Sequence, residues 1–179
     1  MKRVIKRQIG IMGSAGPEEY LYKKPSSKIY KLAEETGYLV AENNCILFCG
    51  GKSGIMESAA KGAKRANGVT VGVIQGNERK QSNKFIDIEI VTNSLTSSDA
   101  PTLITSCDGI IIIGGGAGTL QEVTIAYRNK IPMVSIDTVS GVGKTFANKY
   151  LDERKLIKIK KASSPKEAVE LLMSILDNK

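Results

Sequence analysis

Residues 109–122 read GIIIIGGGAGTLQE, and this stretch decides the fold. The run Gly109–Ile113 is short and continuously apolar, which is typical of a strand covered on both faces in a parallel sheet. Downstream, Thr119–Arg128 carries apolar residues at three- and four-residue spacing, as amphipathic helices do. A buried strand, a glycine turn and a helix in this order indicate part of a βαβ unit.

The same alternation runs along the rest of the chain. It predicts an α/β fold, a Rossmann-like doubly wound parallel sheet of about seven strands with helices on both faces. The expected strands are Gln8–Met12, Cys45–Cys49, Thr70–Ile74, Asp87–Val91, Gly109–Ile113, Met133–Ile136 and a weak one near Leu156–Ile159. The other expected helices are Ser26–Ala41, Ile55–Ala66, Ala100–Ser106, Lys144–Leu151 and Pro165–Leu176.

Length and composition indicate one ordinary globular domain over residues 1–179. No run approaches the roughly 20 apolar residues that cross a bilayer. The three cysteines are an odd number inside apolar segments, which favours reduced, buried thiols over a disulfide framework. We therefore expect a cytoplasmic protein that does not associate with membranes.

The chain has no histidine, which removes Ser-His-Asp, Cys-His and zinc-hydrolase mechanisms and leaves no expected metal site. Its net charge is +8, but the lysines are spread over helices and the C-terminal segment and are not interleaved with aromatic residues. With three Phe, six Tyr and no Trp, stacking platforms for single strands are few. A solvated basic surface is favoured over a nucleic-acid groove.

Glycine turns follow three of the expected strands. They are Gly13-Ser14-Ala15-Gly16, Gly50-Gly51-Lys52-Ser53-Gly54 and Gly114-Gly115-Gly116-Ala117-Gly118-Thr119. Each could be a tight connection, but ligands of parallel sheets bind beyond the carboxyl ends of strands, where amide groups converge. The third turn, with four glycines before a hydroxyl residue that opens a helix, predicts a phosphate cradle.

Three further features of the sequence bear on the site. Glu122 has the spacing of a capping-box partner of Thr119, and it could equally hold a ribose hydroxyl beside a bound phosphate. The segment Ser140–Thr145 lacks the first glycine of a nucleotide-triphosphatase loop and is interpreted as a turn into a helix. The polar stretch Gly76–Lys84 is expected to be a mobile loop near any ligand.

Two glycine segments resemble motifs of one protein family. Gly50–Met56 resembles the GGxxGLM segment, and Gly115–Glu122 the GGxGTxxE segment, of the LOG-like family often mislabelled "lysine decarboxylase". The resemblance extends from about Ile9 to Ile136. It implies a Rossmann-like homodimer or higher homo-oligomer that binds nucleoside monophosphates.

The resemblance also implies roles for individual residues. Phosphate would lie on Gly115, Gly116, Gly118 and Thr119, helped by Gly13 and Ser14, while Gly50, Gly51 and Lys52 would wall the site. Active members hydrolyse the N-glycosidic bond of cytokinin riboside 5′-monophosphates with a glutamate, here Glu122, and an arginine. The arginine position, nine residues before Asp108, is Asp99 here, so the local charge is inverted. Related molybdenum-cofactor carrier proteins would bind a phosphorylated pterin without turnover.

Three functions follow from these residues. The first is a protein that binds a phosphorylated ligand, a nucleoside monophosphate or a pterin, and needs no further cofactor. The second is a nucleoside 5′-monophosphate phosphoribohydrolase, in which Glu122 and Asp99 act as paired carboxylates. The third is a basic nucleic-acid-associated protein. Lysine decarboxylation is rejected, because the sequence shows no lysine and ring-stacking partner for pyridoxal phosphate.

Overall fold

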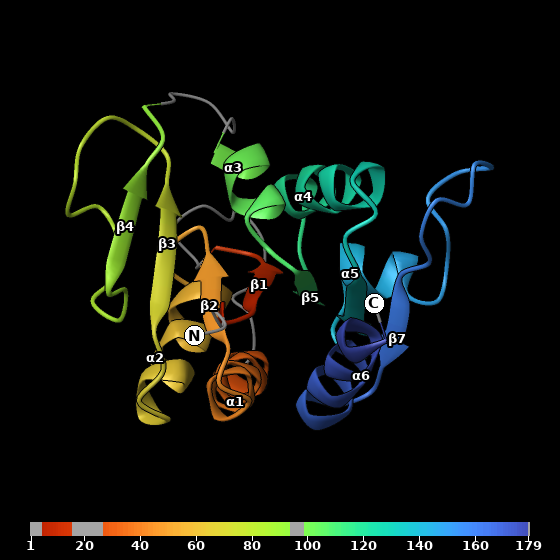
Figure 1. Ribbon diagram of the computed structural model, residues 1–179, viewed down its shortest axis with the longest axis horizontal. Coiled ribbons are helices and arrows are strands. Elements are labelled where there is room, and N and C mark those ends of the chain that lie inside the picture. The colour runs from red at the N-terminus through yellow and green to blue at the C-terminus, as the bar shows by residue number, and fades with distance from the viewer. Residues whose placement is uncertain (1–4, 16–26, 94–98, 179) are drawn as a thin grey trace.

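The computed structural model describes residues 5–15, 27–93 and 99–178. All seven strands of its sheet are parallel, in the order β4-β3-β2-β1-β5-β6-β7 (Figure 1). The strands are β1 (Gln8–Gly13), β2 (Ile46–Cys49), β3 (Thr70–Ile74), β4 (Ile88–Val91), β5 (Gly109–Ile113), β6 (Met133–Ile136) and β7 (Lys160–Ala162). The helices are α1 (Ser27–Glu42), α2 (Ile55–Arg65), α3 (Asp99–Thr105), α4 (Ala117–Arg128), α5 (Val142–Phe146) and α6 (Pro165–Asp177). The predicted α/β, Rossmann-like fold is confirmed.

The isoleucine run of β5 lies next to the central strand β1 and contributes side chains to two separate cores. Ile111 and Ile113 pack with α1, α2 and α6 on one face, and Ile110 and Ile112 pack with α3 and α4 on the other. All four side chains are buried because successive residues of a strand point to opposite faces. The continuous run therefore needs helices on both sides, as the sequence indicates.

Helices α1 and α2 cross at very short range. A Cβ atom added at Gly62 would lie 1.8 Å from the carbonyl oxygen of Glu34, and one at Gly37 would lie 1.9 Å from that of Ala59. Glu34 also receives ion pairs from Lys61 and Arg65 of α2. The pair of helices is thus held together by backbone contact and by charge.

The C-terminal part of the sheet differs from the prediction. The expected strand Leu156–Ile159 is absent, and Lys160–Ala162 pairs with β6 instead. The amide of Leu156 donates to Tyr127 Oη (3.1 Å), and that of Ile159 donates to the carbonyl of Lys149 (2.9 Å), so neither amide is available to a strand. The preceding helix also ends early, at Phe146, because Ala147 has an extended backbone.

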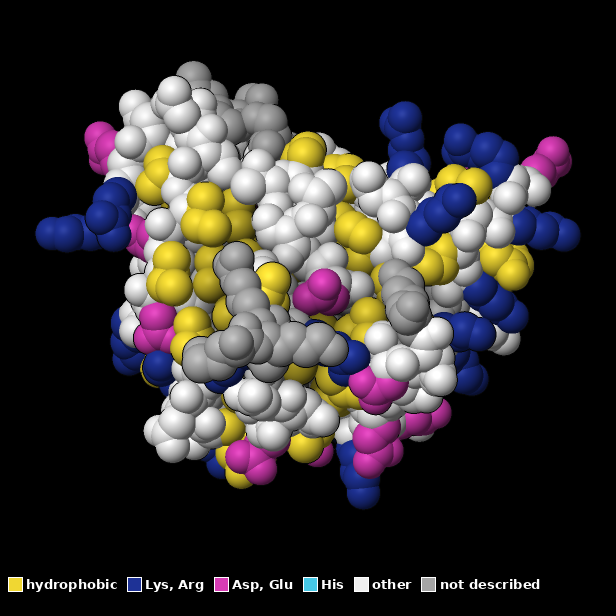
Figure 2. Space-filling model, in the orientation of Figure 1, with side chains coloured by type: hydrophobic (Ala, Val, Ile, Leu, Met, Phe, Trp, Pro, Cys, Tyr) yellow, Lys and Arg dark blue, Asp and Glu magenta, His cyan; other side chains and the backbone are white. Residues whose placement is uncertain are grey.

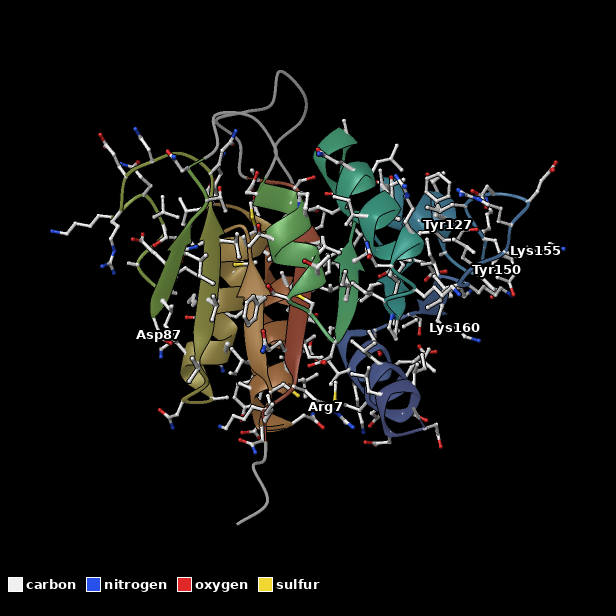
Figure 3. The ribbon with its side chains drawn as sticks, turned by 45° about the horizontal axis from the view of Figure 1, so that its top comes forward. Arg7, Asp87, Tyr127, Tyr150, Lys155 and Lys160 are labelled. Carbon is white, nitrogen blue, oxygen red and sulfur yellow. The ribbon has the colours of Figure 1, made fainter. Side chains whose placement is uncertain are left out.

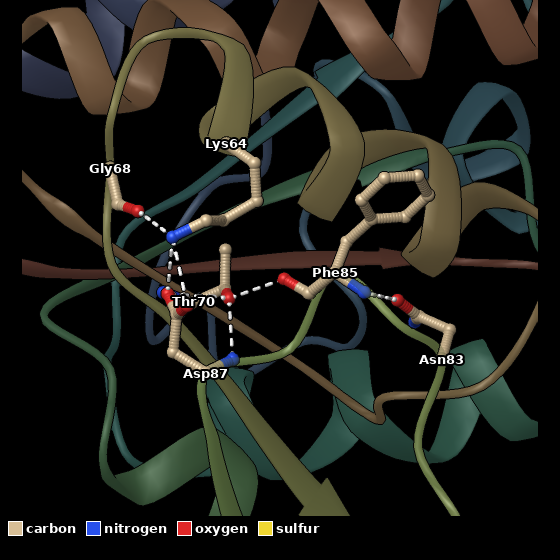
Figure 4. A network of polar contacts seen from close by, with 6 residues as sticks. All are labelled: Lys64, Gly68, Thr70, Asn83, Phe85 and Asp87. Carbon is tan, nitrogen blue, oxygen red and sulfur yellow. Dashed lines mark hydrogen bonds and ion pairs between the residues drawn. The ribbon is translucent and has the colours of Figure 1, made fainter.

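Strand β4 is fixed to β3 by a polar network at its amino end (Figure 4). The buried Thr70 hydroxyl lies 2.6 Å from the carbonyl of Phe85 and accepts from the amide of Asp87 (3.0 Å). Lys64 Nζ donates to both carboxylate oxygens of Asp87, at 2.8 and 2.9 Å. The network sets where the chain turns into the edge strand.

No helix in the described ranges is both long and apolar enough to span a membrane. The three cysteines are free and buried.

Candidate functional site

The site lies where the order of the sheet reverses. Strands β1 and β5 are neighbours, but the chain leaves them in opposite directions across the sheet, toward β2 and toward β6. In open parallel sheets this switch point leaves a crevice beyond the carboxyl ends of the two strands. The turns that follow β1 and β5 are two of the three glycine turns that the sequence singles out.

A cleft of about 350 Å³ opens at this point. We call it the phosphate cleft, after the ligand proposed below. Nine of the eleven predicted site residues line it: Gly13, Ser14, Gly50, Lys52, Asp99, Gly116, Gly118, Thr119 and Glu122. Four strand-to-helix connections therefore converge on one hollow, because all strands are parallel and their carboxyl ends share one edge. Gly16, which ends the first predicted turn, and Ser26, which begins the first predicted helix, lie outside the described residues.

The amino end of α4 faces this cleft. The helix begins at Ala117, and its first regular bond to the turn runs from the amide of Leu120 to the carbonyl of Gly116 (2.9 Å). In the described part of the chain, no backbone carbonyl accepts from the amides of Ala117, Gly118 or Thr119. Free amides at a helix start, together with the helix dipole, favour an anion.

The carbonyls of the same turn are engaged at its back. The carbonyl of Gly114 accepts from the amide of Gly143 (2.8 Å), and that of Gly115 accepts from Val142 (2.9 Å), both at the start of α5. This is the role of the segment Ser140–Thr145, which forms a turn and a short helix as the sequence predicts. The arrangement points carbonyls away from the cleft and leaves amides toward it.

Thr119 does not cap α4. The N-cap residue is Gly116, without a side-chain hydrogen bond, and Thr119 is the third residue of the helix and buried. The capping-box interpretation of Thr119 and Glu122 is therefore wrong. It failed because the helix begins two residues earlier than the apolar spacing indicates, which places Glu122 one turn inside the helix, beside the cleft.

Gly51 and Gly115 do not line the cleft but shape its walls. Gly51 (φ 68°) and Gly115 (φ 96°) have backbone angles that other residues rarely adopt. A Cβ at Gly115 would lie 2.5 Å from the side chain of Thr119, and one at Gly51 would lie 2.4 Å from Ile74 Cδ1. Both glycines are needed for the close turns that bring their neighbours to the cleft.

Two carboxyl groups meet in the cleft. Burial, and then the negative charge of Asp99, raise the pKa of Glu122 to about 8. At neutral pH Glu122 is therefore mainly protonated, and it can donate a hydrogen bond where an ionised carboxylate would repel an anion. Lys52 and Asp99 are the other charged residues among the described residues that line the cleft.

Sequence reasoning missed four lining residues: Ala15, Met56, Gln75 and Ala117. Gln75 follows β3 directly, and its position was predictable because the carboxyl end of β3 lies at the same edge as that of β2. Met56 lies in the first turn of α2, and its Sδ would be 3.0 Å from a Cβ at Gly50. Ala15 and Ala117 lie within the glycine turns that the sequence singles out, and Met56 ends the segment Gly50–Met56, but none of them was among the predicted site residues.

The excess positive charge lies elsewhere. Residues 144–161 contain seven Lys or Arg and two acidic residues, a net +5 of the +8 of the chain. Figure 2 shows blue side chains gathered at the right, over the segment that joins α5 to β7. Lys155, Lys160 and Tyr150 of this basic edge point outward from the sheet (Figure 3).

Comparison with known proteins places the chain in a family. The model of the SLOG cluster4 family matches residues 6–169. An uncharacterised protein of Archaeoglobus fulgidus is 34% identical over 121 residues, which are 68% of this chain and 74% of that protein.

Solved structures agree with this assignment. The X-ray structure of the structural-genomics target TM1055 has a TM-score of 0.85 and 26% identity, and the match covers 94% of this chain and 99% of that one. The molybdenum cofactor carrier protein from Chlamydomonas reinhardtii has a TM-score of 0.80 and 28% identity, over 98% of this chain and 100% of that one. The motifs, the sheet order and these matches agree, and the chain belongs to the SLOG cluster4 family of LOG-like Rossmann-fold proteins.

Proposed function

We propose that this protein binds a small phosphorylated ligand, with the phosphate at the amino end of α4. The observation that carries the proposal is the set of amides at Ala117, Gly118 and Thr119, which open into the cleft without carbonyl partners in the described chain. Lys52, from the turn after β2, supplies the positive charge on the facing wall. The similarity to a cofactor carrier favours binding without turnover as the first function.

A nucleoside monophosphate or a phosphorylated pterin would satisfy this site. Glu122, protonated at neutral pH, would donate to a sugar hydroxyl or an equivalent oxygen next to the phosphate. A protonated acid tolerates the nearby dianion, whereas a carboxylate would repel it. Burial first, and then the negative charge of Asp99, would keep the proton on Glu122, so the inverted charge at Asp99 is compatible with such a ligand.

Gly118 offers a clean test of the phosphate site. A Cβ at this position would meet no atom within 4 Å, so a side chain fits without disturbing the helix. Gly118→Asp and Gly118→Asn have the same size and differ in charge. We expect Gly118→Asp to weaken binding of ribose 5-phosphate at least about tenfold relative to Gly118→Asn, because like charges about 4 Å apart near a surface repel by about 4 kcal/mol.

Isothermal titration calorimetry at pH 7 measures the two affinities, and thermal unfolding of the free variants checks that both are folded. Equal affinity of the Asp and Asn variants for ribose 5-phosphate would place the anion elsewhere and refute the proposal.

A specific observation supports a second candidate, hydrolysis of an N-glycosidic bond. One protonated and one ionised carboxyl group in a single cleft is the pair that glycoside cleavage uses. Glu122 would protonate the departing base, and Asp99 would take a proton from water as its oxygen attacks C1′. The C1′–N bond breaks, and free base and ribose 5-phosphate result.

Incubation with a panel of nucleoside 5′-monophosphates distinguishes the two candidates. Release of free base by the wild type that is lost in both Glu122→Gln and Asp99→Asn supports hydrolysis. Tight binding of a nucleotide with no base release over hours leaves the binding function alone.

A further inference from the structure

Another hollow lies at the opposite edge of the sheet from the phosphate cleft. It has a volume of about 270 Å³. Its lining includes Pro132, which directly precedes β6, Lys160, which begins β7, and Ile175, near the end of α6. Because the strands are parallel, the amino ends of β6 and β7 lie at the edge opposite to the one where the cleft opens. The hollow is therefore separate from the site of the proposed function.

The lining of this hollow, which we call the basic groove, combines aliphatic and basic side chains. The aliphatic members are buried or half-buried, and they are Pro132, Met133, Leu156, Ile157 and Ile175. The other members belong to the basic edge, and they are Tyr150, Lys155, Lys158 and Lys160. No acidic residue is among the described residues that line the groove. An acidic group that enters it would therefore meet positive charge beside an apolar surface.

Within the described part of the chain, the three lysines of the groove form no ion pair with a carboxylate. Asp152, in the same segment, is engaged elsewhere, because it pairs with Arg154 and accepts from Tyr127 Oη (2.6 Å). These bonds, the one with Arg154 first, lower the pKa of Asp152 to about 2. The neighbouring Lys161, which does not line the groove, pairs with Asp137 (3.2 Å). The charge of the groove lysines is thus available to a partner.

The backbone that carries these side chains is held in place at two points. The amide of Leu156 donates to Tyr127 Oη of α4 (3.1 Å). The amide of Ile159 donates to the carbonyl of Lys149 (2.9 Å), which closes residues 149–159 into a loop. A partner would bind a groove that is already formed, and this limits the ordering cost of association.

The size and lining of the groove favour an acidic peptide over a nucleic acid. Its volume lies below the roughly 300 to 1,000 Å³ of small-molecule pockets, and it suits a single anchoring side chain. Single-stranded nucleic acids stack successive bases on aromatic side chains, whereas Tyr150 is the one aromatic residue among the described residues of the lining. An apolar side chain would instead be buried against the aliphatic residues, while carboxylates on either side of it would meet the lysines.

We propose that the basic groove docks an acidic peptide segment of a partner protein, with one large apolar side chain in the groove and Asp or Glu residues on either side of it. The interaction does not depend on the phosphate site, because the groove and the cleft lie at opposite edges of the sheet. It gives the basic edge of the molecule a role of its own.

Three fluorescein-labelled peptides test the proposal. The first has one phenylalanine between two runs of three glutamates, the second has glycine in place of phenylalanine, and the third has glutamines in place of the glutamates. Fluorescence anisotropy at pH 7 and 0.15 M salt measures their affinities for the wild type, for Lys155→Asn/Lys160→Gln and for the control Lys28→Gln/Lys31→Gln. The control removes the same charge from exposed positions of α1, and thermal unfolding checks that each variant is folded.

We expect the acidic phenylalanine peptide to bind the wild type at least about tenfold more tightly than either of the other peptides, because it alone supplies both the anchor and the charges. The groove variant should bind this peptide at least about fivefold more weakly, since two charge-assisted contacts are lost. The control variant should bind it within about twofold of the wild type.

Several results would overturn the inference. One is no binding of the acidic phenylalanine peptide, and another is equal affinity for the acidic glycine peptide, which would indicate attraction by charge alone. Equal losses in the groove variant and the control would place the interaction elsewhere. A labelled oligothymidylate is titrated in parallel. If it binds more tightly than the peptide and loses affinity only in the groove variant, the groove is a nucleic-acid site and the inference falls.

Discussion

Glu122 is the residue whose chemistry depends most on its surroundings. In the sequence it is one acid among eighteen, and in the structure burial and the neighbouring Asp99 raise its pKa to about 8. In the unfolded chain the same carboxyl ionises near 4.5. The folded protein therefore binds one more proton than the unfolded chain between these values, and the contribution of Glu122 to stability must fall as the pH rises.

Glu122→Gln isolates this contribution. The amide has nearly the same shape and does not titrate, so we expect the variant to gain stability relative to the wild type as the pH rises from 5 to 8. A full pKa unit corresponds to about 1.4 kcal/mol, and we expect the difference in unfolding free energy to change by at least about that amount. Urea unfolding followed by circular dichroism at pH 5, 6.5 and 8 measures it. A constant difference across this range would show that Glu122 ionises normally in the folded protein.

Helices α1 and α2 are held together by close backbone contact as well as by the burial of apolar side chains. The crossing of α1 and α2 leaves no room for a side chain at Gly62, where an added Cβ would lie 1.8 Å from the carbonyl oxygen of Glu34. Alanine normally stabilises the interior of a helix relative to glycine by about 1 kcal/mol. Tertiary contact therefore opposes helix propensity at this position.

Gly62→Ala should destabilise the protein by about 1–3 kcal/mol, the cost commonly seen when a packed interface is overfilled. Gly118→Ala is the matched control, since it is also a helical glycine but has open space at its Cβ, and it should be neutral or slightly stabilising. Thermal unfolding of both variants compares them directly. If the two substitutions had the same effect, the α1–α2 contact would not be as close as described.

The turn into the edge strand β4 depends on the hydroxyl of Thr70. Thr70→Val keeps the side-chain shape but leaves the carbonyl of Phe85 without this donor, while the amide of Asp87 keeps the backbone carbonyl of residue 70 as its acceptor. We expect a loss of about 1–2 kcal/mol in stability, because buried polar groups without partners carry a desolvation penalty. Hydrogen exchange should show the loss of protection in β3 and β4 and not in β5 and β6. A uniform loss across the sheet would contradict a local role.

Across the whole molecule, the excess positive charge and the phosphate cleft are separated. The basic edge at residues 144–161 extends from α5 to β7, whereas the phosphate cleft lies at β1 and β5. Two strand spacings of about 4.8 Å already approach the screening length of about 8–10 Å at physiological ionic strength. The net charge of +8 should therefore contribute little to ligand affinity.

Neutralising the basic edge tests this separation. The double variant Lys155→Asn/Lys160→Gln should bind ribose 5-phosphate within about twofold of the wild type at 0.15 M salt, because the removed charges are screened. Lys52→Gln, which removes the cation of the cleft itself, should weaken the same ligand at least about fivefold, since a charge-assisted contact contributes more than a neutral one. Calorimetric titrations measure all three proteins. A comparable loss in both variants would mean that the basic edge acts on the site.

Much of the fold of this protein can be predicted from its amino-acid sequence. The isoleucine run of β5 and the three glycine turns predict the parallel sheet and the edge where the cleft opens, because strand burial and turn geometry are local properties of sequence. Thus nine of eleven predicted site residues line one cleft. The failures at β7 and at the capping box have one cause. Near β7, the amides of Leu156 and Ile159 bond to residues outside their own segment. In the turn before α4, the carbonyls bond to amides of α5, and the helix begins two residues before the position that local spacing indicates.

Other properties exist only once the chain is folded. The raised pKa of Glu122 depends first on burial and then on Asp99 from another element, and Asn83 fastens the stretch Gly76–Lys84 to the turn after β2. Neither partner is near in sequence, so no local pattern reveals them. The sheet and the glycine turns at its edge are predictable from the amino-acid sequence, because strand burial and turn geometry depend on neighbouring residues. Which charges and hydrogen-bonding groups share a site follows from the folded arrangement, because those interactions act through space between separate elements.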